Sequence, residues 1–217
     1  MMDKVLLVGE ASLQTLSMVF FSTIFSLVLG FPLGVLLCVT KRGGIAPKPL
    51  LNQVLSRIVD ILRSFPFIIL MIVLFPLSRI IVGTSIGTTA TIVPLSIAAA
   101  PFVARIIESS LNEVNPELIQ AAKAMGSTTM QIIVKVLVPE ALPSLVDGIT
   151  LTIINLIGYS AMAGAVGGGG LGDLAIRYGY QRFRTDIMAA AIVIILLLVV
   201  LIQFFGSKIS SHLQSRR

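Results

Sequence analysis

Long runs without a charged residue dominate this 217-residue chain and restrict what it can fold into. Four of these runs hold 21 residues or more. A helix that crosses a hydrocarbon core about 30 Å thick needs roughly 20 apolar residues, because each residue adds about 1.5 Å of rise. Each run therefore predicts a transmembrane helix. The four runs are Ala11 to Thr40, Ile80 to Ala104, Gly148 to Gly172 and Ile187 to Ser207.

A fifth candidate span runs from Ile58 to Val82. Its uncharged centre, Ser64 to Ser78, is only 15 residues long, and Asp60, Arg63 and Arg79 flank it. Charged side chains near a helix end can reach the membrane interface or pair with one another. We therefore predict five spans, of which this one is the most marginal in length.

The composition fits a membrane protein and excludes an ordinary soluble domain. Charged residues make up 12% of the chain, against about a quarter in soluble domains, and the mean hydropathy is +1.00. The net charge of +6 does not indicate nucleic-acid binding, because the basic residues are scattered between apolar runs. We expect an all-α polytopic membrane protein whose single domain covers residues 1–217. Its core spans about 11–207, with one long cytoplasmic loop at about 108–147.

The distribution of Lys and Arg predicts the orientation of the spans. Basic residues are enriched in cytoplasmic segments, and five spans place the two termini on opposite sides. With the N-terminus outside, eleven of the sixteen basic residues are cytoplasmic, so we expect an outer N-terminus and a cytoplasmic C-terminus. The eleven are Lys41, Arg42, Lys48, Arg57, Arg63, Arg105, Lys123, Lys135, Lys208, Arg216 and Arg217.

The polar connection from Glu108 to Asp147 predicts a short helix in its first half. Asn115 is a good N-cap, and Pro116 and Glu117 suit the first helical turn. Gly126 supplies the stop. One side of this helix carries an apolar stripe at i, i+3, i+4 and i+7. The stripe consists of Leu118, Ala121, Ala122 and Met125.

A second short helix follows Ser127 and Thr128, either of which could be its N-cap. We expect it to end at Pro139, because proline interrupts the backbone hydrogen bonds of a helix. Such a helix pair can lodge in a groove on a soluble partner. The alternative is an amphipathic helix on the inner leaflet, although two lysines against several glutamates give it little attraction for anionic lipid.

The stretch from Gln120 to Pro143 resembles the Glu-Ala-Ala loop of permease subunits of type I ABC importers. Ala121, Ala122, Gly126, Pro139 and Pro143 match that motif. The resemblance implies coupling helices that dock into a separate ATP-hydrolysing subunit and transmit its closure to the spans. Gln120 stands where the motif usually has Glu, so the charge for a salt bridge to the ATPase is missing. The implied coupling residues are Gln120, Ala121, Ala122, Met125, Gly126 and Pro139.

The resemblance covers nearly the whole chain and is greatest to the methionine-uptake permeases. It implies a bacterial inner-membrane importer of L- or D-methionine that works by alternating access. Implied partners are a second copy of the chain, two cytoplasmic subunits that bind ATP and Mg²⁺, an extracytoplasmic substrate-binding protein or lipoprotein, and membrane lipid. The similar stretches are Arg63 to Leu70, Val82 to Gly87, Ala99 to Glu108, Ala124 to Ile132 and Gly158 to Gly172.

The sequence indicates a transport subunit rather than an enzyme. It has no G-x-x-x-x-G-K-[ST] phosphate loop, so ATP is hydrolysed by another subunit. We expect no cofactor or metal in this chain, because His212 is the only histidine and Cys38 the only cysteine. Two other functions remain open: a type I permease for another small polar solute, and a channel or membrane anchor without ATP coupling.

Polar and soft side chains in the fourth span are candidates for lining the transport pathway or its gate. Asn155, Tyr159 and Met162 lie at i, i+4 and i+7 and share a helix face, and Ser160 adjoins them. Met and Tyr suit a passage that contacts a partly apolar solute, whereas plain helix contact is the alternative for each residue. Outside the membrane, Asp173 to Asp186 either contacts the binding protein or forms a helix at headgroup level.

Overall fold

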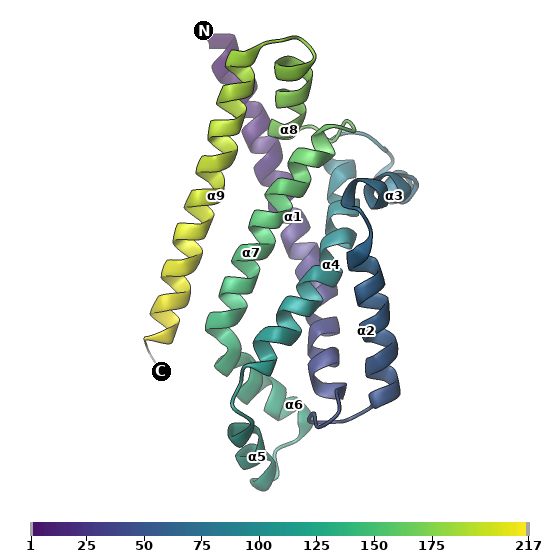
Figure 1. Ribbon diagram of the computed structural model, residues 1–217, viewed down its shortest axis with the longest axis vertical. Coiled ribbons are helices and arrows are strands. Elements are labelled where there is room, and N and C mark those ends of the chain that lie inside the picture. The colour runs from purple at the N-terminus through teal and green to yellow at the C-terminus, as the bar shows by residue number, and fades with distance from the viewer. Residues whose placement is uncertain (1, 216–217) are drawn as a thin grey trace.

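The computed structural model describes residues 2–215, and within that range every regular element is helical (Figure 1). The expected all-α class is therefore confirmed. The α-helices are α1 (Met2–Thr40), α2 (Pro49–Ser64), α3 (Phe67–Val82), α4 (Thr88–Asn112), α5 (Pro116–Ala124), α6 (Thr129–Ile132), α7 (Val138–Gly164), α8 (Gly170–Leu174) and α9 (Thr185–Gln214). Two π-helical segments, η1 (Ile133–Leu137) and η2 (Ala175–Tyr180), lie between α6 and α7 and after α8.

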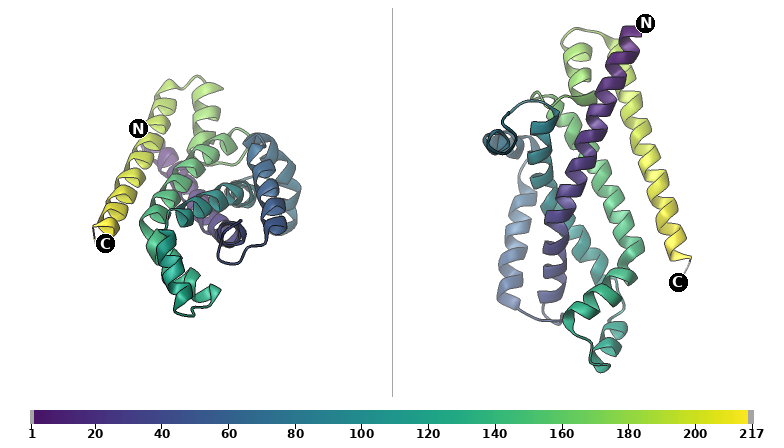
Figure 2. Two further views of the ribbon diagram at one scale, coloured as in Figure 1. Left: turned by 60° about the horizontal axis from the view of Figure 1, so that its bottom comes forward. Right: turned by 180° about the vertical axis from the view of Figure 1, so that it is seen from behind.

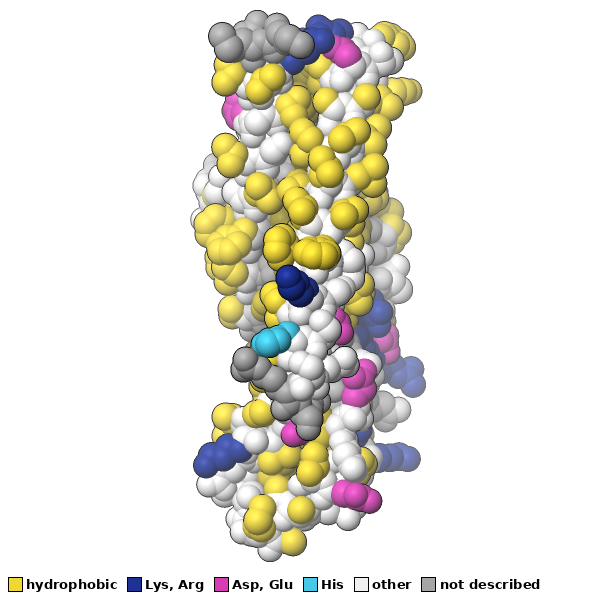
Figure 3. Space-filling model, turned by 90° about the vertical axis from the view of Figure 1, so that its left-hand side faces the viewer, with side chains coloured by type: hydrophobic (Ala, Val, Ile, Leu, Met, Phe, Trp, Pro, Cys, Tyr) yellow, Lys and Arg dark blue, Asp and Glu magenta, His cyan; other side chains and the backbone are white. Residues whose placement is uncertain are grey.

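Helices α1, α4 and α9 are each long and apolar enough to cross a membrane. The most apolar window of α9 has a mean hydropathy of 3.2, and only 11% of it is buried within the chain. On the face that Figure 3 shows, hydrophobic side chains form a broad band, and charged side chains lie above and below it. Because an exposed apolar surface of this size requires a non-aqueous environment, the chain is a multi-pass membrane protein.

Helix α7 is the counterpart of the fourth expected span and lies beside α4 and α9 (Figure 1). Unlike the three helices above, it does not meet the length and hydropathy criteria for a membrane span by composition alone. Its Thr150 and Thr152 hydroxyls donate to carbonyls one turn back at 2.8 and 2.9 Å, so both are satisfied without water. The helix ends at Gly164 rather than at Gly172, as a loop with positive φ begins after it.

The second expected span is not one helix. It breaks after Ser64 into α2 and α3, which are bent by 103° relative to each other, and α3 lies across the long axis of the bundle (Figures 1 and 2). Pro66 causes the break, since it disfavours helical dihedrals in the residue before it. Phe65 is accordingly extended, with φ −67° and ψ 132°. The expected span from Ile58 to Val82 is therefore formed by two helices with a sharp bend between them.

The third expected span begins later than predicted. Gly83 and Gly87 adopt φ values of +84° and +99°, which stop α3 and start a new helix at Thr88 rather than at Ile80. Helix α4 then continues past Ala104 to Asn112. The N-terminus lies at one end of the bundle, and α5 and α6 project from the other end, toward which α9 also runs (Figures 1 and 2).

The contact between α1 and α4 depends on two glycines one turn apart. A Cβ atom at Gly30 would lie 2.6 Å from the carbonyl oxygen of Ala100, and one at Gly34 would lie 2.6 Å from that of Ala104. Lipid gives no hydrophobic driving force between helices, so such close backbone approach supplies the van der Waals contact that holds them together. Gly30 and Gly34 thus form a G-x-x-x-G contact with α4.

We predict that Gly34→Val separates α1 from α4 and destabilises the protein, because the added methyl groups overlap Ile107 and the backbone of Ala104. The cost of such overpacking is about 1–3 kcal/mol or more. The measurement is the thermal midpoint of the detergent-solubilised chain, which should fall. Gly9→Ala is the control, since nothing lies within 4 Å of a Cβ there; equal midpoints for both variants would contradict the prediction.

Candidate coupling surface and transport face

Helix α5 forms as the sequence predicts. The Asn115 side chain accepts a hydrogen bond from the Glu117 backbone N–H at 2.9 Å, and Pro116 occupies the first turn. At the other end, Gly126 has φ +79°, and the Ser127 N–H donates to the carbonyl of Ala122 at 3.1 Å. The cap and the stop are both confirmed, so α5 is a rigid short helix rather than a flexible loop.

Helix α6 begins at a capping box. The Thr128 hydroxyl accepts from the backbone of Gln131, and the Gln131 side chain accepts from the backbone of Thr128 at 2.8 Å. The structure therefore selects Thr128, and not Ser127, as the N-cap. Two reciprocal bonds at the start of a four-residue helix hold the direction in which the chain leaves α5.

The second short helix does not end at Pro139, contrary to the prediction. The chain passes through the π-helical segment η1 into α7 without a break, and the Val138 N–H donates to Ile133, five residues back. Pro139 lacks an N–H and its ring would collide with the carbonyl four residues back in an α-helix. A wider π turn just before it relieves this conflict. Helix α6, the segment η1 and the helix α7 therefore form one continuous helix.

The loop is anchored to the bundle by a buried apolar cluster. Ala122 is only 3% exposed and belongs to one cluster with Leu111 of α4 and Leu137 of η1. Ile132 and Cys38 lie in the same cluster, and the Cys38 thiol donates to Asn112 at 3.3 Å. The prediction of a single apolar stripe on α5 therefore needs correction, because Ala122 turns inward while the other three residues face outward.

The outward side of the loop is an exposed apolar tip. Met125 is 80% exposed and Met130 is 69% exposed, and Leu118 and Val134 are exposed as well. Of the other predicted coupling residues, Gln120, Ala121, Gly126 and Pro139 are all exposed. Gln120 also lines a cavity of about 210 Å³ between α5 and the loop after α1. Methionine-rich exposed surfaces adapt to a partner's shape, so the tip suits protein contact.

The predicted pathway residues on α7 do not share one environment. Ser160 is buried and its hydroxyl donates to Ile157 at 2.8 Å, so it serves helix contact. Tyr159 is half-buried and stacks on Phe67 of α3, with ring centroids 4.3 Å apart. Asn155 is half-buried, and Met162 is 44% exposed. Within this group, Tyr159 is the residue that stacks on an aromatic ring of another helix.

A cavity of about 200 Å³ surrounds the Tyr159–Phe67 pair. Residues of α2, α3, α4 and α7 line it, including Arg63 and Phe102. The guanidinium of Arg63 lies 6.0 Å from the centroid of the Phe102 ring. Sequence reasoning missed Arg63, Phe67 and Phe102 as site residues. Pro66 was the available signal, because a break in a span creates a cavity.

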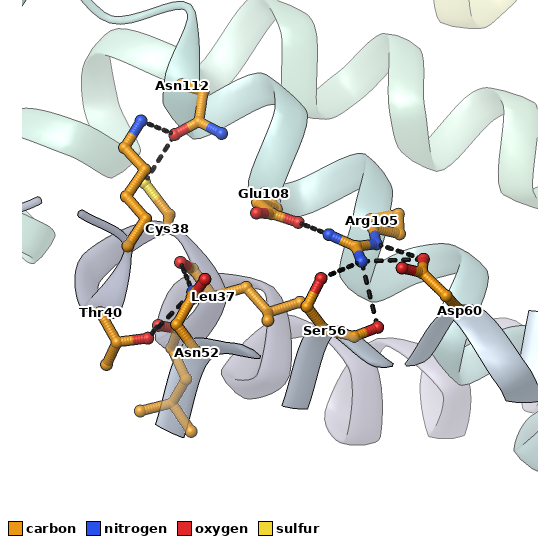
Figure 4. A network of polar contacts seen from close by, with 11 residues as sticks. Leu37, Cys38, Thr40, Asn52, Ser56, Asp60, Arg105, Glu108 and Asn112 are labelled. Atoms are coloured by element: carbon orange, nitrogen blue, oxygen red, sulfur yellow. Dashed lines mark hydrogen bonds and ion pairs between the residues drawn. The ribbon is translucent and has the colours of Figure 1, made fainter. Parts of the chain in front are cut away.

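A second feature missed from the sequence is the polar contact of α2 with α4 (Figure 4). Arg105 of α4 donates to Asp60 at 2.8 and 3.1 Å and to Glu108 at 2.6 Å. It also donates to the backbone and hydroxyl oxygens of Ser56. Nearby, the Asn52 side chain donates to the Leu37 carbonyl at 2.7 Å. These bonds hold the polar side of α2 against the bundle.

At the end of the bundle opposite α5 and α6, α1 is hydrogen-bonded to the start of α8. Backbone N–H groups of Gly170 and Leu171 donate to Gln14 and Thr15 of α1, each at 2.9 Å. These bonds satisfy the start of α8. Asp186 at the start of α9 pairs with Lys4 and Arg184. The segment between them contains η2, with Tyr178 beneath Arg182 at 4.7 Å and Phe183 exposed.

Comparison with known proteins matches these features to membrane transport components. Residues 26–214 match the family described as binding-protein-dependent transport system inner membrane component. The probable D-methionine transport system permease protein MetI of Vibrio cholerae is 50% identical over 206 residues, which are 95% of this chain and 92% of that protein. The D-methionine transport system permease protein MetI of Escherichia coli K12 is 54% identical over 151 residues, 70% of each chain.

Solved structures agree with this match. Two structures described as inward-facing conformations of the MetNI methionine ABC transporter have TM-scores of 0.91 and 0.94, at 51% and 49% identity. They cover 92% and 96% of this chain and 93% and 97% of those chains. An amino acid ABC transporter at 19% identity has a TM-score of 0.74, which shows the fold alone.

The fold and these matches therefore define a permease subunit with the ABC type I transmembrane fold. The chain belongs to the family of binding-protein-dependent transport system inner membrane components. It is a transport subunit rather than an enzyme, as the sequence predicts.

We predict that Arg105→Gln loosens α2 from α4. The change removes the ion pairs to Asp60 and Glu108, and hydrogen bonds to charged groups contribute about 1.5–3 kcal/mol where they are buried and less where they are exposed. The thermal midpoint of the detergent-solubilised chain should therefore fall. Arg57→Gln on the same polar side of α2 is the control and should leave the midpoint unchanged. An unchanged midpoint for Arg105→Gln would show that apolar contacts alone hold α2.

Proposed function

We propose that the chain is the membrane-spanning permease of an ATP-driven importer of methionine and works by alternating access. The observation that carries the proposal is the rigid α5–α6 loop, whose apolar tip is exposed and whose second helix continues into α7. An exposed apolar tip indicates contact with a partner protein, and its continuity with α7 lets movement of that partner reach the span. Support for methionine comes from the MetI relatives and the MetNI structures, which are similar over nearly the whole chain.

In the proposed mechanism, the exposed side of α5 lies in a groove of the ATPase. Ala121 allows close approach, Met125 fills the groove, and Gln120 offers amide hydrogen bonds in place of a charge. Movement of the docked loop reaches α7 directly, because no break separates α6, η1 and α7. The opposite end of α7 carries Tyr159 and Met162, so closure of the ATPase shifts the residues that we assign to the pathway.

The proposed assembly contains two copies of the chain and two ATP-binding subunits, which hold ATP and Mg²⁺. One coupling loop per chain matches one ATPase per permease. The family description, binding-protein-dependent, supports an extracytoplasmic substrate-binding protein or lipoprotein as a further partner, and we place its contact at Asp173 to Asp186. The N-terminus is then outside and the C-terminus cytoplasmic, since the coupling loop lies at the end opposite the N-terminus (Figure 1).

We predict that Met125→Asp abolishes methionine uptake without unfolding the chain. Met125 is 80% exposed, so a carboxylate there costs the fold little but burying it in the ATPase groove is unfavourable. The measurement is uptake of labelled methionine by a strain that lacks this chain and its paralogues and carries the variant, together with co-purification of the ATPase. We expect at least tenfold less uptake and loss of the ATPase from the purified complex.

Ile86→Asp is the matched control. Ile86 is also exposed and apolar, but it lies in the loop between α3 and α4 and away from the coupling loop. It should keep the ATPase bound. Wild-type uptake by Met125→Asp would contradict the docking role. Methionine uptake that does not depend on the wild-type chain would contradict the substrate assignment and leave the docking result intact.

The orientation predicts opposite labelling of two single-cysteine variants in a Cys38→Ala background. Met130→Cys in the coupling loop should react with a membrane-impermeant maleimide only after the cells are opened. Tyr180→Cys, at the other end of the bundle, should react in intact cells, since Tyr180 is 74% exposed. Labelling of the Met130 position in intact cells would reverse the orientation and place the coupling loop outside.

A further inference from the structure

Arg63 carries a positive charge in the last turn of α2, beside the break that separates α2 from α3. Helix α2 starts at Pro49, beside the end of α1, and Arg63 is 14 residues further on. At about 1.5 Å per residue it lies about 21 Å along the helix axis from that start, in the last turn of α2. Helices α2 and α3 together have the length and composition of a broken span, and a charged residue within a span is costly and is kept where it serves a partner or a pathway.

No carboxylate of the described chain neutralises Arg63. Within residues 2–215, no ion pair joins Arg63 to Asp or Glu, and the neighbouring Asp60 is bonded to Arg105. The recorded interaction of Arg63 is with the face of the Phe102 ring, at 6.0 Å from its centroid. An aromatic face attracts a cation only weakly at this distance. The guanidinium therefore keeps its donors for another anion.

Arg63 lines the cavity that the α2–α3 break opens next to α4 and α7. The cavity has a volume of about 200 Å³, equal to roughly seven water molecules, which is the size class of one amino acid. Its lining combines Arg63 with several aromatic rings, and the stacked pair of Phe67 and Tyr159 lies on one side. A cavity with one fixed cation and an aromatic wall is complementary to a small amphipathic anion or zwitterion.

We propose that this cavity is a solute-binding site on the transport pathway. Arg63 binds the carboxylate of a zwitterionic amino acid, and the Phe67–Tyr159 pair contacts its apolar side chain. Arginine matches a carboxylate with two parallel hydrogen bonds, and aromatic ring edges contact thioether sulfur favourably. This inference rests on the proposed function and adds to it the residues that select the solute class.

The break at Pro66 brings both parts of the site together. It ends α2 just after Arg63 and starts α3 at Phe67. The sharp bend between the two helices places the guanidinium and the aromatic ring beside the same cavity. Tyr159 then completes the site from α7, the helix that continues from the coupling loop. Movement of α7 relative to α3 would separate the stacked rings and release the solute.

Binding to the full chain in lipid nanodiscs tests the proposal without the ATPase, so that subunit cannot contribute a site. Saturation binding of labelled L-methionine, L-leucine and L-phenylalanine is measured for wild type, Arg63→Gln, Arg63→Lys and the control Arg57→Gln. Unlabelled methionine and methioninamide, which lacks the carboxylate, serve as competitors. We expect Arg63→Gln to bind at least tenfold more weakly, Arg63→Lys to bind with intermediate affinity, and Arg57→Gln to bind as wild type.

The competitors separate binding from a structural effect. Wild type should prefer methionine over methioninamide at least tenfold, and Arg63→Gln should lose that preference. A retained preference, wild-type affinity in Arg63→Gln, or no binding of any labelled amino acid by wild type would each overturn the proposal. Loss of the dimer in Arg63→Gln, seen by size-exclusion chromatography with light scattering, would overturn it in favour of an ion pair between chains. The same pattern with leucine alone would keep this site and reject methionine as the solute.

Discussion

Helices α1 and α4 pack with their backbones in close contact, and this contact holds the centre of the bundle. Lipid does not drive helices together, so the helices associate only where small residues allow their backbones to approach. Gly30 and Gly34 provide that surface. Helix α4, once held there, contacts α2 and α3 on one side and α7 on another, and all three positions follow from its place in the bundle.

The π-helical segment η1 allows the helix to continue past Pro139 and so joins α6 to α7 without a break. Pro139 would end an α-helix, and a helix end there would uncouple the loop from α7. The wider turn instead carries the chain through, while Leu137 remains buried against Ala122 and Leu111. The loop is therefore anchored on its inner side and continuous with the span, which leaves its outer side for a partner.

Proline has the opposite effect at the second span. Pro66 separates α2 from α3, and no π turn compensates for it, so α3 lies across the bundle axis (Figure 2). The break allows α2 to keep a polar side, which Arg105 ties to α4 through Asp60 and Ser56 (Figure 4). It also opens the cavity beside Tyr159. Pro66 therefore breaks a helix, whereas Pro139 does not, because the π-helical segment η1 precedes it.

The all-α class, the approximate position of most spans, and helix α5 with its cap at Asn115 and stop at Gly126 could be predicted from sequence. These features depend on apolar length and on local capping, which a linear pattern records. The three-dimensional arrangement was needed to show that Ala122 faces inward and that the helix continues past Pro139. It was also needed to show that the span breaks at Pro66 and that Arg63 and Tyr159 share a cavity. Each of these depends on residues far apart in sequence, and no local pattern encodes which helix a side chain meets.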